Sequence, residues 1–374
     1  MTGFAVRGWC PNAWRPMAAG DGLLVRVKPR LGRLARAQLL GLCEASLAHG
    51  NGLIDLTNRG NLQLRGVSDA GWPLLIDRLI TLGLVDPDPK TEQRRTLLVA
   101  PDWQAGDDTH RIAEDFLTRL GALPVLPGKT GFVIDAGPVP MLKDAPGDFR
   151  IERGVEGGVI LRLDGRAAGT PLPTGDEAAA LVRLAQWFVA SGGDAAGRAT
   201  RHAAPLPDWA AERVALAPVG PPVVPGPHRL GTAVGVPFGQ LDAKALLHGI
   251  PESATAVRIT PWRMLLIEGD GIHSPTLIDA AGDPLLRADA CVGAPACPQA
   301  SVDTRALARR LAPLVAGSLH VSGCAKGCAR ARPADVVVTG RDGLLDLAFR
   351  ARAGADPTHP ALSPAALLSL FGTP

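Results

Sequence analysis

The sequence predicts an α+β protein that contains an internal repeat and, near its C-terminus, a metal centre bound by cysteines. Both strand-like alternation and helical periodicity occur along the chain, so the protein contains strands as well as helices. A strand pattern over residues 20–66 recurs, at low identity, over residues 229–269. Four cysteines also gather within the 38 residues 291–328. Together these three observations predict the fold class, its internal repeat and its metal centre.

Composition sets the outer limits. A chain of 374 residues favours two to three domains, each able to bury a core. A net charge of +3 and a pI of about 8.6 are too mild to indicate a nucleic-acid binder. No apolar run approaches the roughly 18 residues that a membrane helix needs, and the first residues lack the pattern of a secretory signal. We therefore expect a cytoplasmic protein, in which clustered cysteines indicate metal more often than disulfides.

Periodicity predicts most elements. Strands are expected at residues 22–27, 53–65, 94–102 (running into a loop), 149–152, 158–163, 229–236, 257–269, 318–322, 334–340 and 343–349. Helices are expected at residues 31–49, 68–82, 108–120, 176–190, 307–315 and 361–370. The dense prolines of residues 205–227 indicate an extended connector and not a packed element.

The internal repeat is remote but regular. Residues 229–236 correspond to residues 20–27, and Thr260 to Gly269 has the same spacing as Thr57 to Gly66. In this alignment Trp262 and Arg263 stand where the first copy has Arg59 and Gly60. A period of more than 200 residues predicts pseudo-twofold symmetry and not a solenoid.

The cysteines stand as C-x5-C, Cys291 and Cys297, followed by C-x3-C, Cys324 and Cys328. Four thiolates can hold a tetranuclear iron–sulfur cluster or a zinc ion. The first pair is wider than a zinc knuckle, so the spacing favours iron. Zinc, two disulfides and four buried thiols remain alternatives. Of the other two cysteines, we expect Cys10 to be structural and Cys43 to lie in a core.

A polar stripe lies in the first copy of the repeat. In an extended chain, the alternate residues from 57 to 65 share one face, with Leu62 and Leu64 on the other. Arginine forks on such a face suit carboxylates, because they bind them in a bidentate manner. A solvated sheet face is the alternative. The residues of this stripe are Thr57, Arg59, Asn61, Gln63 and Arg65.

These motifs resemble one family group. C-x5-C followed by a distant Gly-Cys-x3-Cys is similar to the cluster motif of sulfite and nitrite reductases. Within that group, the stretch from His320 to Ala329, His-Val-Ser-Gly-Cys-Ala-Lys-Gly-Cys-Ala, most resembles the precorrin-3B synthases. Thr-Asn-Arg-Gly-Asn-Leu-Gln at residues 57–63 is similar to the family's Thr-x-Arg-x-x-x-Gln. Residues 126–135, which begin with Leu-Pro-Gly-Lys, resemble the Leu-Pro-x-Lys strand that opens the family's central domain, and this implies a strand there. The opening Arg7-Gly-Trp-Cys-Pro-Asn is similar to that of the synthases.

The resemblance implies a reductase-like fold. Two pseudo-symmetric ferredoxin-like half-repeats (residues 1–88, with an N-terminal arm, and 218–285) would accompany a central domain (89–217) and an iron–sulfur domain (286–374). It implies a 4Fe-4S cluster on the four cysteines and a mononuclear non-haem iron whose ligands the sequence does not identify. The implied substrate is precorrin-3A, with dioxygen and a ferredoxin-like or flavoprotein electron donor, and without nucleic acid or membrane. The implied substrate-binding residues are Thr57, Arg59, Asn61, Gln63, Arg65, Arg258, Arg263 and Lys129.

Three functions therefore compete. The first is an oxidoreductase, a monooxygenase that hydroxylates precorrin-3A and closes a lactone to give precorrin-3B in cobalamin biosynthesis. The second is a sulfite or nitrite reductase that holds sirohaem as a cofactor. The third is a non-enzymatic electron carrier or zinc module, which leaves the polar stripe unexplained. Histidines 202, 228, 248, 273 and 320 are candidate ligands of a second iron, although none stands in a ligand-spaced pair.

Overall fold

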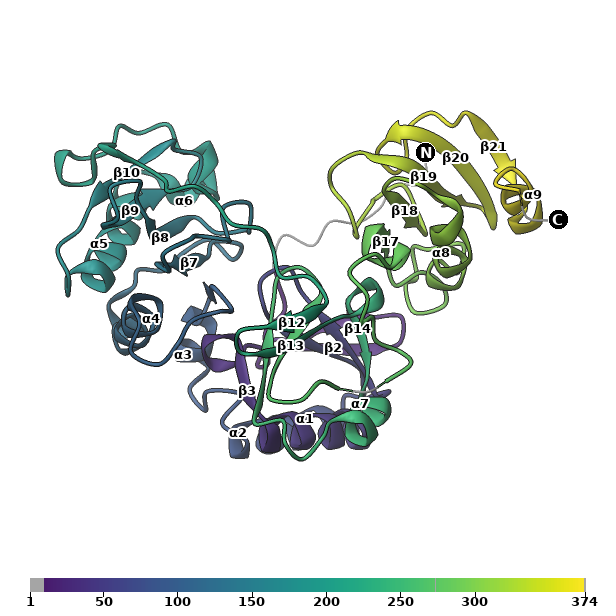
Figure 1. The fold of residues 1–374 in the computed structure, drawn as a ribbon, viewed down its shortest axis with the longest axis horizontal. Helices are drawn as coiled ribbons and strands as arrows, with labels where there is room; N and C mark the ends of the chain where they lie inside the picture. The colour runs from purple at the N-terminus through teal and green to yellow at the C-terminus, as the bar shows by residue number, and fades with distance from the viewer. Residues whose placement is uncertain (1–9, 273, 373–374) are drawn as a thin grey trace.

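The computed structural model describes residues 10–272 and 274–372. Figure 1 shows three lobes: a base that carries α1, α2, β2 and β13, and two upper lobes that rise from it on either side. One upper lobe contains α4, α5 and β7 to β10, and the other contains α8, α9 and β17 to β21. Within the described part of the chain, no helix combines the length and the apolar character needed to cross a membrane.

The base consists of two five-stranded sheets with matching strand orders. The first sheet runs β1 (Met17–Ala19), β2 (Gly22–Val27), β5 (Leu62–Val67), β4 (Leu53–Leu56) and β14 (Gln240–Asp242). The second runs β12 (Gly226–His228), β13 (Gly231–Gly235), β16 (Met264–Glu268), β15 (Ala256–Ile259) and β3 (Arg33–Ala35). Each strand of one sheet has a counterpart in the other, so the predicted pseudo-twofold repeat is present in the base.

The two halves exchange their edge strands. β3 belongs to the first copy but pairs with β15, and β14 belongs to the second copy but pairs with β4. Equivalent turns set up both exchanges, with Leu31 at φ 51° before Gly32 at 70°, and Phe238 at φ 55° before Gly239 at 72°. This left-handed turn delays the helix, because successive residues at positive φ cannot continue a right-handed helix. The prediction of a helix from residue 31 is therefore wrong at its start, since α1 begins at Arg36.

The polar stripe is interrupted by a turn. β4 ends at Leu56 and β5 begins at Leu62, so residues 57–61 are not extended as the alternation predicted. The Thr57 Oγ1 accepts hydrogen bonds from the backbone N–H groups of Arg59 (3.3 Å) and Asn61 (3.2 Å). This is an ST-turn, in which a side-chain oxygen replaces a strand partner.

The second copy repeats this turn. The Thr260 Oγ1 accepts from the N–H groups of Trp262 (3.3 Å) and Met264 (3.2 Å). Gly60 (φ 64°) and Arg263 (φ 61°) occupy the equivalent left-handed position. The two copies are recognisable as a repeat by the geometry that their turns share, more than by sequence identity.

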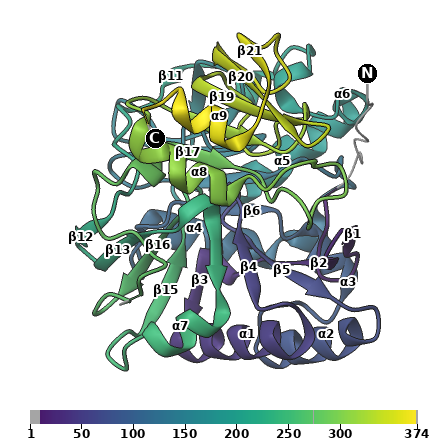
Figure 2. The same cartoon turned by 90° about the vertical axis from the view of Figure 1, so that its right-hand side faces the viewer.

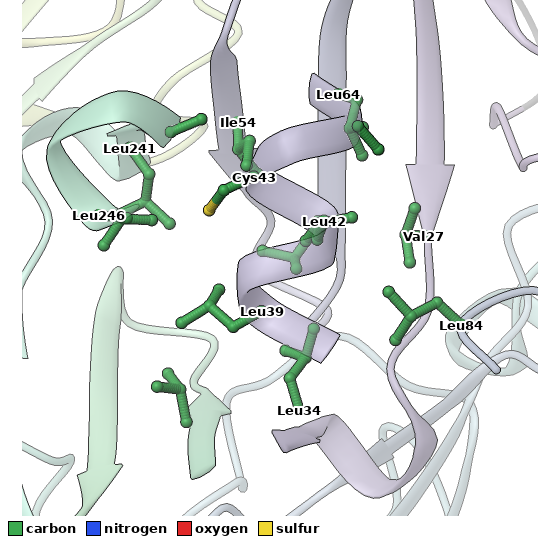
Figure 3. Packing of buried hydrophobic residues seen from close by; sticks show 14 of the residues in the cluster. Val27, Leu34, Leu39, Leu42, Cys43, Ile54, Leu64, Leu84, Leu241 and Leu246 are labelled. Atoms are coloured by element: carbon green, nitrogen blue, oxygen red, sulfur yellow. The ribbon is translucent and has the colours of Figure 1, made fainter. Parts of the chain in front are cut away.

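Helices α1 (Arg36–His49), α2 (Gly71–Thr81) and α7 (Ala243–Gly249) lie along the bottom of the base, beneath the strands (Figure 2). They pack with both halves into one apolar core, part of which Figure 3 shows. Leu64 and Leu241 come from opposite copies and are both at most 2% exposed. Cys43 lies in this core, fully buried as predicted, and burial raises its pKa to about 12.

The central lobe contains a six-stranded mixed sheet. Its order is β11 (Val214–Ala215), β10 (Ala168–Pro171), β9 (Val159–Leu163), β8 (Phe149–Arg153), β7 (Phe132–Asp135) and β6 (Leu97–Val99). Its helices are α3 (Pro89–Arg94), α4 (Asp108–Thr118), α5 (Glu177–Ala190) and α6 (Gly193–Ala196). The strand predicted from residue 126 begins only at Phe132. The proline-rich segment 205–227 contributes β11 and starts β12, so it is not a plain connector.

The C-terminal lobe contains the sheet that bears the cysteines. Strands β17 (Ala288–Ala290), β18 (Leu319–Ser322) and β19 (Ala334–Arg341) are parallel, and β20 (Leu344–Ala351) and β21 (His359–Leu362) continue antiparallel. Helices α8 (Arg305–Leu311) and α9 (Pro364–Ser369) complete it. The predicted pairing of the last long strands as a hairpin is confirmed by the register of β19 and β20. The four domain bounds stay a prediction.

Candidate functional site

Both cysteine pairs lie at one edge of the C-terminal sheet. Cys291 directly follows β17, and Cys324 follows β18 after one glycine. Because these strands are parallel neighbours, their carboxyl ends meet at the same edge. The Gly323 N–H donates to the Cys291 Sγ at 3.2 Å, which joins the second cysteine loop to the first.

The cysteine loops are held by hydrogen bonds to main-chain oxygens. The Thr304 hydroxyl donates to the Cys291 carbonyl oxygen (2.6 Å), and the Ser322 hydroxyl donates to that of Cys324 (2.8 Å). Gly323 has no room for a side chain, since a Cβ there would lie 2.5 Å from the Ala300 Cβ. The loops are therefore fixed by contacts that do not involve a metal.

The four thiols fit a cluster. None is in a disulfide; Cys291, Cys297 and Cys324 are half-buried and Cys328 is exposed. Burial raises the pKa of Cys328, opposed by Lys326, and the charges of the other three cysteines raise it further, so all four lie within electrostatic range. In residues 10–272 and 274–372, no three or more His, Cys, Asp and Glu side chains gather closely enough for one metal ion. The four cysteine ligands of a cubane cluster lie farther apart than the ligands of a single metal ion, because each thiolate binds its own iron.

The first cysteine loop rests on the base. The Gly20 N–H donates to the Ala296 carbonyl oxygen at 3.1 Å, and a Cβ on Gly20 would lie 2.8 Å from that oxygen. Gly20 precedes β2, whose six residues span about 20 Å. The far end of the same strand enters a cavity.

This cavity, of about 650 Å³, lies between the base, the N-terminal segment and the central lobe. Its volume is within the range of small-molecule sites, roughly 300–1,000 Å³. Cations line it on the base and on α3 of the central lobe, and the segment 123–127 forms an apolar wall. The residues that matter here are Cys10, Arg26, Lys28, Arg59, Asn61 and Arg94.

Arg59 and Asn61 are the predicted binding residues that reach this cavity. The ST-turn places Arg59 beside the central lobe, where its Nη2 donates to the Lys129 carbonyl oxygen at 2.6 Å. That bond uses one of the five N–H donors of a guanidinium. Burial lowers the pKa of Arg59, and a neighbouring Cys10 thiolate would raise it. Cys10, which we expected to be structural, therefore lines the cavity beside an arginine.

Arg26 and Lys28 were missed by the sequence reasoning. Arg26 in β2 and Lys28 directly after it alternate with Val25 and Val27, which are fully buried in the core, so their side chains lie on the cavity face. The Arg26 Nη2 donates to the Gln63 Oε1 (2.8 Å), while its buried Nε has no partner among the described residues. The alternation of valine with cations was the signal available in the sequence.

Lys28 is a buried cation. It is 8% exposed, its Nζ donates to the Glu92 carbonyl oxygen and it lies 3.6 Å from the Glu92 Oε1. Burial lowers its pKa to about 8; the Glu92 charge opposes this, and the charges of Arg95 and Arg26 add to it. Lys28 is therefore a cation whose charge depends on pH near neutrality.

Arg65 and Gln63 lie on one face of β5, as predicted, but they bind other side chains. Arg65 is 4% exposed and donates to both Asp21 (2.8 and 2.9 Å) and Asp55 (3.0 Å). The Gln63 Oε1 accepts the bond from Arg26. Arg65 thus already has two carboxylates of its own chain.

Two further predicted binding residues, Arg258 and Arg263, link lobes. Arg258 donates to the Glu268 carboxylate (2.6 Å) and to the carbonyl oxygen of Pro101 (2.9 Å) in the central lobe. Arg263 donates to the carbonyl oxygens of Ala288 (2.8 Å) and Leu286 (3.2 Å) in the C-terminal lobe. The Lys129 side chain is exposed. Trp262 packs into two apolar clusters between the base and the central lobe.

The structure groups none of the candidate histidines as metal ligands within the described residues. His202 bonds to the Ser191 hydroxyl (2.8 Å), His228 accepts from the Leu230 N–H (3.3 Å) and His248 is 2.7 Å from the Lys244 carbonyl oxygen. His320 is fully buried in the C-terminal lobe. His273 lies outside the described residues, as do residues 7–9 of the opening motif.

The comparisons agree with this geometry. Residues 15–81 match the nitrite/sulfite reductase ferredoxin-like half domain. The structure of Mycobacterium tuberculosis NirA protein is similar, with a TM-score of 0.55 and 18% identity over 90% of this chain and 76% of that one. The fold is therefore that of the nitrite and sulfite reductases.

A curated relative narrows the class. The precorrin-3B synthase of Sinorhizobium sp is 31% identical over 395 aligned positions, which cover 94% of this chain and 84% of that protein. The chain belongs to the precorrin-3B synthase family, and it is an enzyme of the oxidoreductase type.

Proposed function

We propose that this enzyme is an oxygen-dependent monooxygenase of cobalamin biosynthesis, which hydroxylates the precorrin-3A macrocycle and closes a lactone to give precorrin-3B. The observation that carries the proposal is the basic cavity on the base, joined through β2 to the lobe with the four cysteines. An electron donor of ferredoxin or flavoprotein type would supply reducing equivalents. The unpaired thiols suit a reducing compartment such as the cytoplasm.

The cavity cations bind the carboxylate rim of the macrocycle. Arg59 offers a planar fork, and the buried Nε of Arg26 offers a donor that has no partner in the described residues. Lys28 adds a charge at the same wall. Asn61 can donate to a carbonyl or carboxylate oxygen from the end of the turn. Together these side chains orient the macrocycle by its edge, and the apolar segment 123–127 contacts its body.

Cys291, Cys297, Cys324 and Cys328 would hold the 4Fe-4S cluster. The bound cluster would supply electrons singly, which dioxygen needs because it is a ground-state triplet. Cys291, Cys297 and Cys324 would hold it from half-buried positions, and Cys328 from an exposed one. For a mononuclear iron, the described residues contain no group of three His, Cys, Asp or Glu side chains that could serve as ligands.

Binding of the carboxylate rim is expected to weaken above about pH 8, because Lys28 loses its proton there and its charge with it. In Lys28→Arg the dissociation constant should stay level between about pH 7 and 9, since an arginine remains protonated. The measurement is a titration with a carboxylate-rimmed porphyrin at each pH. The same pH dependence in both proteins would show that another group controls binding.

A sirohaem-dependent reductase remains the second candidate, because its cofactor is also a carboxylate-rimmed macrocycle and the overall fold is shared. Anaerobic purification separates the two. The synthase is expected to show a broad iron–sulfur absorption without sharp tetrapyrrole bands, since its macrocycle leaves as product. A tightly bound tetrapyrrole chromophore that persists through purification would favour the reductase.

A further inference from the structure

The C-terminal lobe contains a fully buried imidazole. His320 in β18 is 0% exposed, and neither ring nitrogen has a partner among the described residues. Buried polar groups in native proteins nearly always have one. Burial lowers the pKa of His320, opposed by Asp289 and assisted by Arg330, and so favours the neutral ring, which carries one N–H donor.

The strand alternation directs this ring toward the second cysteine loop. Leu319 and Val321 point into the apolar core of the lobe, so His320 and Ser322 lie on the opposite face. The Ser322 hydroxyl donates to the Cys324 carbonyl oxygen on that face. A Cβ on Gly327 would lie 3.6 Å from the His320 Cε1, so the loop between the two cysteines covers the ring.

The neighbouring charged groups form no hydrogen bond with the His320 ring nitrogens among the described residues. Asp289 is paired with His320 in the register of β17 and β18. One Asp289 oxygen accepts from Arg330 Nη1 at 2.8 Å, and the other lies 3.4 Å from Arg263 Nη1. The acidic partner beside the ring is therefore occupied by two arginines.

We propose that His320 donates its ring N–H to a sulfur of the bound cluster and thereby sets the reduction potential of that cluster. The proposal rests on the cluster proposed above. Sulfide and thiolate sulfurs accept hydrogen bonds, and such bonds raise the potential, because they stabilise the more negative, reduced state. His320 is thus a positioning and tuning residue behind the cysteines.

The first test uses the wild-type protein. Enzyme labelled with ¹⁵N-histidine is loaded with its cluster and reduced, and pulsed electron paramagnetic resonance is recorded. A nitrogen coupling to the cluster spin is expected, and it should vanish in labelled His320→Gln. Absence of this coupling in the wild type would overturn the role of His320. Absence of acid-labile sulfide would instead overturn the cluster itself.

The second test measures the midpoint potential. His320→Leu removes the donor and should lower the one-electron potential by about 59 mV, a tenfold shift in the equilibrium. His320→Gln retains an N–H donor and should recover most of this shift, while His359→Gln, which changes an exposed histidine of the same lobe, should have no effect. Equal potentials in the Leu variant and the wild type would contradict the proposal. The labelling experiment decides the question even where a variant loses its cluster.

Discussion

Serine in place of Cys291, Cys297, Cys324 or Cys328 is expected to abolish the iron and acid-labile sulfide bound by the purified protein, and activity with it. Each iron of a cubane needs one thiolate, and three thiolates rarely hold the cluster securely. The loss should be nearly complete at each of the four positions, because the two loops that bear them meet at one sheet edge. Iron and sulfide assays on anaerobically purified variants measure it.

Cys43→Ala is the matched control. This thiol is fully buried in the base core, away from the cysteine loops, so the variant should keep its iron and sulfide even where it loses stability. Stoichiometric zinc without sulfide in the wild type would disprove the cluster. Retention of the full cluster by any of the four serine variants would remove that cysteine from the ligand set.

Arg59→Ala is expected to weaken precorrin binding by roughly 10- to 100-fold without unfolding the enzyme. A charge-assisted hydrogen bond contributes about 1.5–3 kcal/mol, and 1.4 kcal/mol corresponds to a factor of ten. The turn that carries Arg59 is held by the Thr57 hydroxyl and by main-chain bonds, so it should persist without the guanidinium. Equilibrium titration with precorrin-3A gives the dissociation constants.

The dissociation constant of Arg59→Lys should lie between those of the wild type and Arg59→Ala, since a lysine keeps the charge but not the planar fork. Arg201→Ala serves as the control, because Arg201 is exposed on the central lobe and does not line the cavity. A dissociation constant that is the same in Arg59→Ala and the wild type would mean that the cavity cations do not contact the substrate.

Much of the fold could be predicted from local patterns. Alternation located β2 and β18, and the spacing from threonine to glycine revealed the repeat despite low identity. The exchange of β3 and β14 could not be predicted, because both are three-residue strands whose pairing depends on the other half of the chain. Such contacts are set by tertiary packing, which leaves little trace in a short segment.

The site was only partly predictable for a related reason. The parity rule correctly placed Gln63 and Arg65 opposite Leu62 and Leu64, but it assumed an extended chain through residues 57–61, where the ST-turn intervenes. The rule also cannot predict which groups the side chains of a strand face contact. Arg65 forms ion pairs with two carboxylates of its own chain, whereas Arg26 lines the cavity.

The most direct test of the account is the fate of dioxygen. The enzyme is incubated with precorrin-3A and a ferredoxin-type or chemical reductant under isotopically heavy dioxygen, and the product is analysed by mass spectrometry. The account predicts one heavy oxygen atom in the macrocycle, with the other reduced to water by two external electrons. A product that forms equally well without oxygen, or that carries oxygen only from water, would contradict it.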